Sequence, residues 1–244
     1  AAENDQLNNF LASEKDALGL DFLSIVQPTS IDEHMLKWPV VQAALSGRAR
    51  TAVDLFEADD LLMIDVALVE QAELILIPTE AAVPTDKVAE TRGMMIHTAA
   101  PVSIKGSQRV LVGGILLNRN LDFIDTINTL VYQRKNTAED PRGTATLFLE
   151  DVRITTNVRL FENVRALGTR VSAEVRHAVL DEGQTWLDRA FVVNDWYISG
   201  YLPIYDSFNQ RIGMLYVGFL EEPFRLVKRD AIAMMWIAFI SVLL

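Results

Sequence analysis

Apolar residues along this chain follow two spacings, one helical and one typical of strands. Leu7, Phe10, Leu11 and Leu18 fall on one helical face, so residues 7–18 predict an N-terminal helix. Most other apolar segments are short runs bounded by glycine, proline or polar turns, a pattern typical of strands. Strands or strand-like runs are predicted at 21–27, 74–77, 93–102, 109–117, 144–149, 152–158, 190–193, 196–204 and 212–219, and further helices at 38–45, 123–131 and 171–183.

Two segments of the chain are similar at a fixed offset. Pro101 precedes Arg109 by eight residues, and Pro203 precedes Arg211 by eight residues, at an offset of 102 in both cases. Each segment reads as two strands joined by a polar turn. Because the offset nearly halves the chain, it predicts two copies of one structural module.

The order of the predicted elements indicates an α+β fold. A helix, a strand with a short helix, and three antiparallel strands follow one another, and the series then repeats. This is the layout of PAS-like sensor domains, with an antiparallel sheet and flanking helices in each of two tandem modules. We expect an N-terminal helix at 1–20, a membrane-distal module at 21–135, a membrane-proximal module at 136–224 and the start of a transmembrane helix at 225–244, with the linker near 136–143.

The last residues of the chain are almost wholly apolar. From Ala231 to Leu244 no charged side chain occurs, which gives about 14 residues and roughly 21 Å of helix against the ~30 Å of a bilayer core. A helix packed in the domain's own core is the alternative, but it would normally show a polar face. We therefore interpret the chain as a fragment that leads into a transmembrane segment.

Charge and composition exclude several classes of function. The net charge of −11 argues against nucleic-acid binding, and the absence of cysteine excludes disulfides and thiolate chemistry. His34, His97 and His177 are far apart and lack the spacing of metal ligands. We find no catalytic motif, and so we expect no enzymatic activity, metal or cofactor in this part of the protein.

An acidic run is expected to be a solvent-exposed face. Its carboxylates are Asp54, Glu57, Asp59, Asp60 and Asp65. A divalent-cation site is the alternative, although the run lacks the glycine and the spacing of a calcium loop.

Several longer motifs resemble the double Cache sensor family, specifically its Cache 3/Cache 2 fusion type. They lie at 92–96, 113–120, 143–149, 151–158, 168–172, 189–198 and 212–218. The segment 161–164 departs from the family pattern, which often has a tight glycine-containing turn there. The resemblance implies an extracytoplasmic ligand-sensing region of a bacterial receptor in the cell membrane. The output of such receptors is a histidine kinase, a chemoreceptor or a cyclic-di-GMP enzyme.

Candidate ligand-binding residues come from side chains suited to a small anion. Arginine binds carboxylates through a bidentate fork, and Arg170 and Arg189 flank the helix of the second module. Strand alternation places Tyr197, Ser199 and Tyr201 on one sheet face. The alternative is that the arginines pair with Glu174 or Asp188 while the tyrosines lie in the core.

The first module offers analogous candidates. Arg92 and His97 occupy comparable positions, and His97 aligns with Ser199 in the repeat. A histidine with its hydrogen bonds satisfied in the core is the alternative for His97. Trp196 falls on the sheet face opposite the tyrosines and is expected in the core.

These observations predict a membrane-anchored sensor that binds a small solute, such as an organic acid or an amino acid. Binding would shift a two-state equilibrium and move the helix that enters the membrane. We expect a homodimer and no nucleic-acid partner. The alternative is an adaptor, a membrane-tethered domain that binds a partner protein and has no small-molecule cavity.

Overall fold

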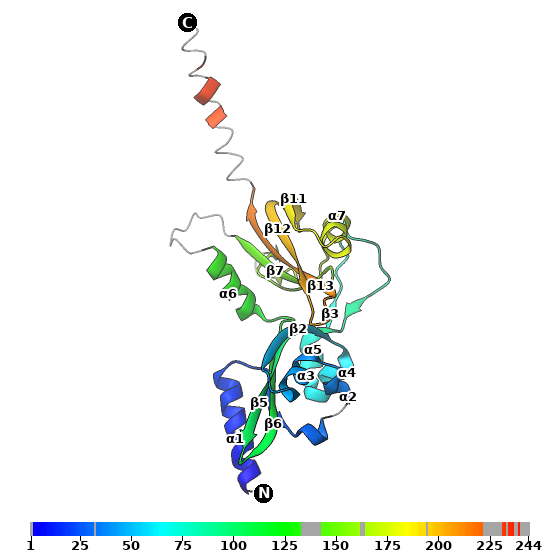
Figure 1. The fold of residues 1–244 in the computed structure, drawn as a ribbon. Coiled ribbons are helices and arrows are strands. Elements are labelled where there is room, and N and C mark those ends of the chain that lie inside the picture. The colour runs from blue at the N-terminus through cyan, green and yellow to red at the C-terminus, as the bar shows by residue number, and fades with distance from the viewer. Residues whose placement is uncertain are drawn as a thin grey trace.

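The computed structural model describes residues 2–31, 33–132, 143–161, 164–193 and 195–221, together with residues 231, 232, 234–236 and 239. Its main body consists of two antiparallel sheets with helices against them, arranged one after the other along the molecule (Figure 1). This confirms the predicted α+β class. The predicted N-terminal helix is also present, as α1 (Ala2–Ala17).

The first sheet has the strand order β1-β6-β5-β2. Helix α1 lies on one side of this sheet, and a group of short helices lies on the other (Figure 1). The strands are β1 (Phe22–Val26), β2 (Arg50–Phe56), β5 (Gly93–Ile104) and β6 (Ser107–Leu116). The short helical elements are η1 (Pro28–Ser30), α2 (Glu33–Leu36), α3 (Pro39–Leu45), α4 (Ala58–Ile64) and α5 (Val66–Ala72).

The second sheet has the order β11-β12-β13-β7-β8. Its strands are β7 (Thr144–Leu149), β8 (Val152–Thr156), β11 (Trp186–Val192), β12 (Asp195–Tyr205) and β13 (Arg211–Leu220). Helix α6 (Leu121–Val131) contacts β7 and β8, whereas α7 (Ala173–Arg176) continues into a π-helical turn, η2 (His177–Asp181), that contacts β12 and β13. Two small ribbons complete the described elements: β3 (Leu74–Ile75) with β4 (Ala89–Glu90), and β9 (Arg159–Phe161) with β10 (Val164–Arg165).

The two sheets repeat one pairing scheme. In each, the first strand in sequence pairs with the last, so β1 joins β6 and β7 joins β13. The last strand then continues through a hairpin, β5–β6 or β12–β13, to an outer strand, β2 or β11. The two similar sequence segments are these hairpins, as the offset predicted. Strand β8 extends the second sheet and has no counterpart among the strands of the first.

The two sheets share an apolar core. One cluster of buried side chains contains Met94 and Leu117 from the first half, and Leu147, Ile154 and Ile212 from the second. Two further clusters lie between each sheet and its own helices. The first and second sheets are therefore packed against each other as well as joined by the chain.

A segment that follows β3 crosses onto the second sheet. We call residues 77–83 the strap. The backbone N–H of Ile77 donates to the carbonyl of Gly168, and the N–H of Ala173 donates to the carbonyl of Ala81, at 2.9 Å and 2.8 Å. The N–H of Arg170 donates to the hydroxyl of Thr79 at 3.1 Å. The first half of the chain thus contributes part of the wall around the second sheet.

Two expectations about burial were wrong. Trp196 was expected in the core but is 46% exposed, on a face of the second sheet with exposed Leu187 and Phe191. The acidic run was expected to be solvated throughout, but Asp54 and Asp60 are buried because neighbouring side chains satisfy their oxygens.

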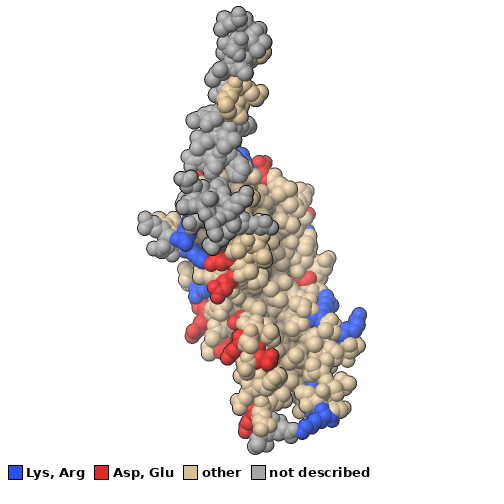
Figure 2. All heavy atoms as spheres, turned by 90° about the vertical axis from the view of Figure 1, so that its left-hand side faces the viewer, with Lys and Arg blue, Asp and Glu red and all other residues tan. Residues whose placement is uncertain are grey.

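The exposed charge is unevenly distributed over the surface. Figure 2 shows acidic side chains gathered along one side of the face it presents.

Some expectations concern residues outside the described part of the chain. These are most of the predicted linker at 136–143, Glu162 and Asn163 of the atypical segment, and most of the apolar tail. Among the residues that are described, no helix has the length and apolar character needed to cross a membrane.

Candidate functional site: a cavity around Arg153

A cavity of about 470 Å³ lies between the strap and the inner face of the second sheet. We call it the Arg153 cavity. Its polar lining includes Thr79, Glu80, Arg153, Thr169, Arg170 and Tyr201, and apolar side chains such as Leu160, Ala190 and Val192 complete it. Its volume lies within the range of about 300–1,000 Å³ that is usual for small-molecule sites.

Arg153 is buried without a carboxylate partner. Its exposed fraction is 3%, and its guanidinium lies over the ring of Phe148, 5.0 Å from the ring centroid. One terminal nitrogen donates to the hydroxyl of Thr169, whereas Nε has no hydrogen-bond partner. Within the described ranges, no aspartate or glutamate forms an ion pair with it. The strand places it there because β8 alternates, so Val152 and Ile154 point away from the side that Arg153 faces.

The electrostatics of Arg153 favour an incoming anion. Burial lowers the pKa of its guanidinium. The ordinary pKa of arginine is so high that the group nevertheless stays charged at neutral pH. A buried unpaired charge is costly, since neither water nor a counter-ion compensates it. A carboxylate entering the cavity would supply both the charge and the hydrogen-bond acceptors that Arg153 lacks.

Tyr201 adds a neutral hydrogen-bond donor. Its exposed fraction is 2%, and its side chain lines the cavity together with Arg153. Burial raises the pKa of Tyr201, and the nearby Arg153 charge only partly opposes this, so the phenol keeps its proton. Tyr201 was predicted as a ligand residue, and the structure places it on the cavity wall.

Arg170 also borders the cavity, but its charge is paired. Its Nε and one terminal nitrogen contact the two oxygens of Asp151, at 3.2 Å and 2.6 Å, and another nitrogen donates to the carbonyl of Val83 in the strap. Arg170 therefore pairs with Asp151, and not with Glu174 or Asp188, the partners considered from the sequence. Arg170 holds the strap against the second sheet while its side chain forms part of the wall.

The other candidates of the second module lie outside this cavity. Arg189 is on the outer sheet face, where it stacks over Trp196 at 4.9 Å and pairs with Glu221 at 2.8 Å. The Ser199 hydroxyl is buried and donates to the carbonyl of Tyr197. Neither Tyr197 nor Ser199 lines the cavity.

The candidate residues of the first module also lie outside the Arg153 cavity. Arg92 lies between Glu90 and Glu150, 2.9 Å from each carboxylate. His97 lines a different cavity, next to the first sheet, and its Nε2 lies 2.6 Å from Asp54. The structure therefore brings Arg170 and Tyr201 together and leaves the remaining five predicted residues elsewhere.

Sequence reasoning did not identify Arg153 as a ligand residue. The available signal was a charged side chain inside an otherwise apolar strand, between Val152 and Ile154. Such a residue is most often placed at an exposed position on a half-buried strand. Its burial follows from the strap and α7, which cover that face of the sheet.

The rim of the cavity contains a strained residue. Val193 has a φ of 62°, in the left-handed region that β-branched side chains rarely adopt. It follows β11 directly and lines the cavity. Such strain costs about 1–3 kcal/mol and occurs frequently at ligand sites.

The groups that line the cavity are suited to binding a ligand. No group of three or more histidine, aspartate or glutamate side chains among the described residues is arranged to hold a metal ion. The cavity offers a cation, a phenol and a hydroxyl above an apolar floor, which suits a small carboxylate.

Comparison with known proteins shows what the second half of the chain is similar to. No curated protein matches the chain. Among solved structures, the chain is similar to the periplasmic domain of Vibrio cholerae LuxQ, with a TM-score of 0.41 and 13% sequence identity over 89% of this chain and 80% of that one. Residues 115–231 match the family model of single cache domain 3. The part of the chain that carries the second sheet is thus similar to a Cache domain, which indicates an extracytoplasmic sensing domain.

Proposed function

We propose that this chain is the sensing region of a bacterial membrane receptor and that it binds a small carboxylate in the Arg153 cavity. In this proposal the chain holds two tandem Cache modules, at 21–135 and 136–224, on the outer side of the cell membrane. The shared pairing scheme of the two sheets supports the second module boundary. The single observation that carries the ligand class is the buried guanidinium of Arg153 with no carboxylate partner among the described residues.

The lining narrows the ligand further. Arg153 and Tyr201 would hold a carboxylate at the buried end, while Glu80 of the strap lines the same cavity and is exposed. An ammonium group at the strap end would pair with Glu80. The ligand is therefore an organic acid of a few carbons or an amino acid, with a short apolar body against Ala190 and Val192.

Signalling would follow from the two walls of the cavity. One wall is the strap, which leaves the first half of the chain after β3, and the other is the second sheet. A ligand that touches both walls stabilises their closed arrangement by its differential affinity for that arrangement. Strand β13 belongs to the second sheet and precedes the apolar tail, so a shift of the sheet would reach the membrane side of the domain.

The test is ligand-dependent thermal unfolding with matched arginine variants. Residues 1–221 are screened against short monocarboxylates, dicarboxylates and amino acids. A ligand at about 100 times its Kd stabilises by about 2.7 kcal/mol, a shift of several degrees. Arg153→Met should abolish the shift, whereas Arg189→Met, which removes an arginine on the outer face, should leave it intact. A shift that survives Arg153→Met would contradict the proposal.

An adaptor role is the second candidate, and one observation favours it. The outer face of the second sheet exposes several large apolar side chains: Leu187, Phe191, Trp196, Ile198 and Leu202. Exposed apolar patches frequently mark protein interfaces. If no carboxylate or amino acid shifts the unfolding temperature, and substitution of Phe191 and Trp196 by serine disrupts receptor signalling, the adaptor role would be preferred.

A further inference from the structure

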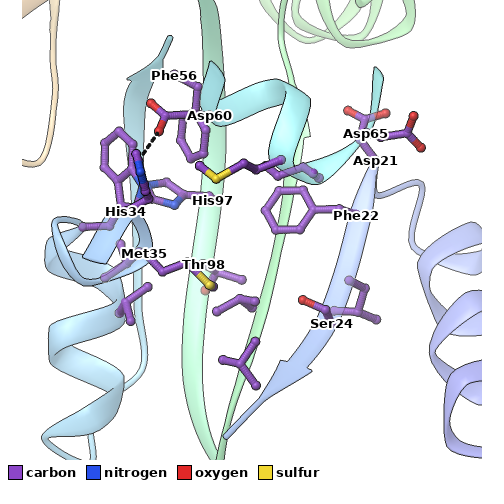
Figure 3. Close-up of a pocket in the computed structure, with 18 of the residues that line it drawn as sticks. Asp21, Phe22, Ser24, His34, Met35, Phe56, Asp60, Asp65, His97 and Thr98 are labelled. Carbon is purple, nitrogen blue, oxygen red and sulfur yellow. Dashed lines mark ion pairs between the residues drawn. The ribbon is translucent and has the colours of Figure 1, made fainter. Parts of the chain in front are cut away.

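A second cavity, of about 490 Å³, lies between the first sheet and its short helices. We call it the His97 cavity. Figure 3 shows Asp21 and Asp65 at one end of it, His97 and Phe56 toward the opposite side, and the ring of Phe22 between them. It shares no lining residue with the Arg153 cavity.

His97 connects this cavity to the second sheet. Its Nε2 lies 2.6 Å from Oδ2 of Asp54, and both residues are buried. The other oxygen of Asp54, Oδ1, accepts two hydrogen bonds from Ser207, from its N–H at 2.8 Å and from its hydroxyl at 2.7 Å. Ser207 lies in the turn between β12 and β13. Three residues thus form a continuous path from the cavity wall to a hairpin of the other sheet.

The turn that carries Ser207 is held in shape. One carboxylate oxygen of Asp206 accepts the N–H groups of Phe208 and Gln210, at 2.9 Å and 2.7 Å. The ring of Phe208 lies 6.2 Å from that of Trp38, which itself lines the His97 cavity. The turn therefore meets the cavity wall at two places, one polar and one aromatic.

The protonation states along the path follow from its contacts. Burial alone would raise the pKa of Asp54, but hydrogen bonds from His97 and Ser207 outweigh it and the pKa is lowered. Asp54 is thus an ionised acceptor, and Nε2 of His97 donates to it. Nδ1 is the ring nitrogen of His97 that does not contact Asp54. The ring packs edge-on against the stacked rings of Trp38 and Phe56, at 5.3 Å and 5.1 Å from their centroids, so Nδ1 is the atom left for an occupant.

The opposite end of the cavity is suited to a cation. Asp21 uses one oxygen to accept the N–H of Leu116 at 2.6 Å, and Asp65 uses one to accept the N–H of Ala67 at 2.9 Å. Each retains a second carboxylate oxygen. Asp60 lies on the side of His34 and His97 (Figure 3) and pairs with Lys37 at 2.6 Å. Lys15 also lines the cavity, and it pairs with its neighbour Asp16 at 3.5 Å. Asp21 and Asp65 therefore leave the net charge of this end negative.

We propose that the His97 cavity binds a small amine with an apolar body and a hydroxyl donor, and that the path His97–Asp54–Ser207 reports its occupancy to the second sheet. The ammonium group pairs with Asp21 and Asp65, the body lies against Phe22 and Phe56, and the hydroxyl donates to Nδ1 of His97. A hydrogen bond at Nδ1 restricts the orientation of the imidazole, and this strengthens the hydrogen bond from Nε2 to Asp54. Asp54 is then more ordered, and its hydrogen bonds to Ser207 are stabilised. The β12–β13 turn becomes more ordered when the cavity is filled.

The test uses three probes that differ by one group each. Tyramine carries both the ammonium and the hydroxyl, 2-phenylethylamine lacks the hydroxyl, and 3-(4-hydroxyphenyl)propionate replaces the ammonium by a carboxylate. Binding to residues 1–221 is measured by calorimetry, and Trp38 fluorescence, measured in a Trp186→Phe, Trp196→Phe background, locates it. Hydrogen exchange of the peptide that spans 205–212 reports the turn. We expect tyramine to bind and to slow this exchange about fivefold or more, 2-phenylethylamine to bind without slowing it, and the propionate not to bind.

Two variants separate the path from the cavity. Ser207 does not line the cavity, so Ser207→Ala should bind tyramine with an affinity close to that of the parent. The response of the turn should be reduced in Ser207→Ala, where the backbone N–H still reaches Asp54, and abolished in Asp54→Asn. Ser107→Ala, at the corresponding turn of the β5–β6 hairpin, is the matched control and should behave as the parent. If none of the probes binds, or only the propionate does, the amine site is wrong. If tyramine binds and the turn of the parent does not respond, or the turn of Asp54→Asn responds as strongly as that of the parent, the path is wrong. Neither result depends on Arg153.

Discussion

Arg92 Nη1 lies 2.9 Å from Oε1 of Glu150, so a side chain just before β5 meets the β7–β8 turn of the other sheet. The same guanidinium also contacts Glu90, whose carboxylate is almost fully buried. Burial opposes these ion pairs, but they prevail and raise the pKa of Arg92. Arg92 was predicted as a ligand residue. Its two carboxylate partners instead indicate a structural role between the two halves of the chain.

The two glutamates that contact Arg92 should differ in their effect on stability. The Glu90 side chain is 1% exposed, and it also accepts from Lys87 at 2.6 Å and from two backbone N–H groups. Breaking a buried pair leaves uncompensated groups, so Glu90→Gln should lower the free energy of unfolding by about 3–5 kcal/mol. Glu150 is 47% exposed, and Glu150→Gln should cost less than about 1 kcal/mol. Urea unfolding at pH 7 measures both, and equal effects would contradict this assignment.

Stability should fall in acid because of Glu90 and Asp54. Burial would raise the pKa of each carboxyl, but hydrogen bonds from Arg92 and Lys87, or from His97 and Ser207, lower it below its ordinary value. A carboxyl with a depressed folded-state pKa contributes stability above its unfolded pKa, near 4, and loses it as pH falls through the folded value.

We therefore expect the free energy of unfolding to decrease progressively below about pH 5. Urea titrations between pH 7 and pH 3 measure this decrease. In Glu90→Gln the free energy of unfolding should depend less steeply on pH, because the proton that Glu90 takes up on unfolding is no longer involved. A variant curve that runs parallel to that of the parent would exclude Glu90 as a source of the acid sensitivity.

The hairpins were predictable from sequence because their information is local. Alternating apolar residues and a polar turn fix β5–β6 and β12–β13 within about 25 residues each. The same holds for α1 and α3, whose apolar stripes are contiguous. The short strand β2 was not predicted, since Asp54 interrupts its apolar pattern and made the segment appear solvated.

The candidate site was less predictable because its contacts are distant in sequence. Asp54 is buried only because Ser207, 153 positions away, donates to it. Arg153 is buried because the strap, about 70 residues earlier, covers its side of the sheet. Arg170 and Tyr201 were identified from residue type and strand alternation, but the same reasoning also selected Arg189, which lies on the outer face. Residue type can thus suggest anion binding without identifying which arginine faces the cavity.

Tyr132 fastens the end of α6 to the second sheet. Its hydroxyl accepts the N–H of Gly218 at 2.9 Å and donates toward the carbonyls of Thr144 and Gly218, at 3.0 Å and 3.1 Å. Burial raises the pKa of Tyr132 to about 12, although its hydrogen bond to Gly218 works against this. Tyr132→Phe leaves those backbone groups unsatisfied and should lower the free energy of unfolding by about 1–3 kcal/mol.

The control for this change is Tyr205→Phe, because Tyr205 is 43% exposed. Its effect should remain within about 0.5 kcal/mol of zero. Chemical unfolding of the two variants at pH 7 gives the comparison. If Tyr132→Phe were as stable as Tyr205→Phe, the hydroxyl would not be holding α6 to the sheet.

Arg153 should reduce the stability of the unliganded protein. A buried cation with no counter-ion is retained at a cost, and replacing buried ionic groups by apolar ones of similar size is often neutral or stabilising by about 1–4 kcal/mol. Arg153→Met removes the charge that lies over Phe148 and leaves a shorter, unbranched apolar side chain in its place. We expect this variant to unfold at a higher temperature than the parent when no ligand is present. Arg170→Met should have the opposite effect, because it leaves the buried carboxylate of Asp151 with the longer contact to Arg176, at 3.7 Å, and releases Val83 of the strap.

The comparison distinguishes a binding arginine from a structural one. Without ligand, we expect Arg153→Met to unfold at a higher temperature than the parent. In the presence of a carboxylate that stabilises the parent, the parent should unfold at the higher temperature, since only the parent gains binding free energy. Differential scanning calorimetry with and without that carboxylate measures both orders. If Arg153→Met without ligand unfolds several degrees below the parent, Arg153 stabilises the fold through Thr169 and Phe148. Its unpaired charge would then no longer indicate an anion-binding site.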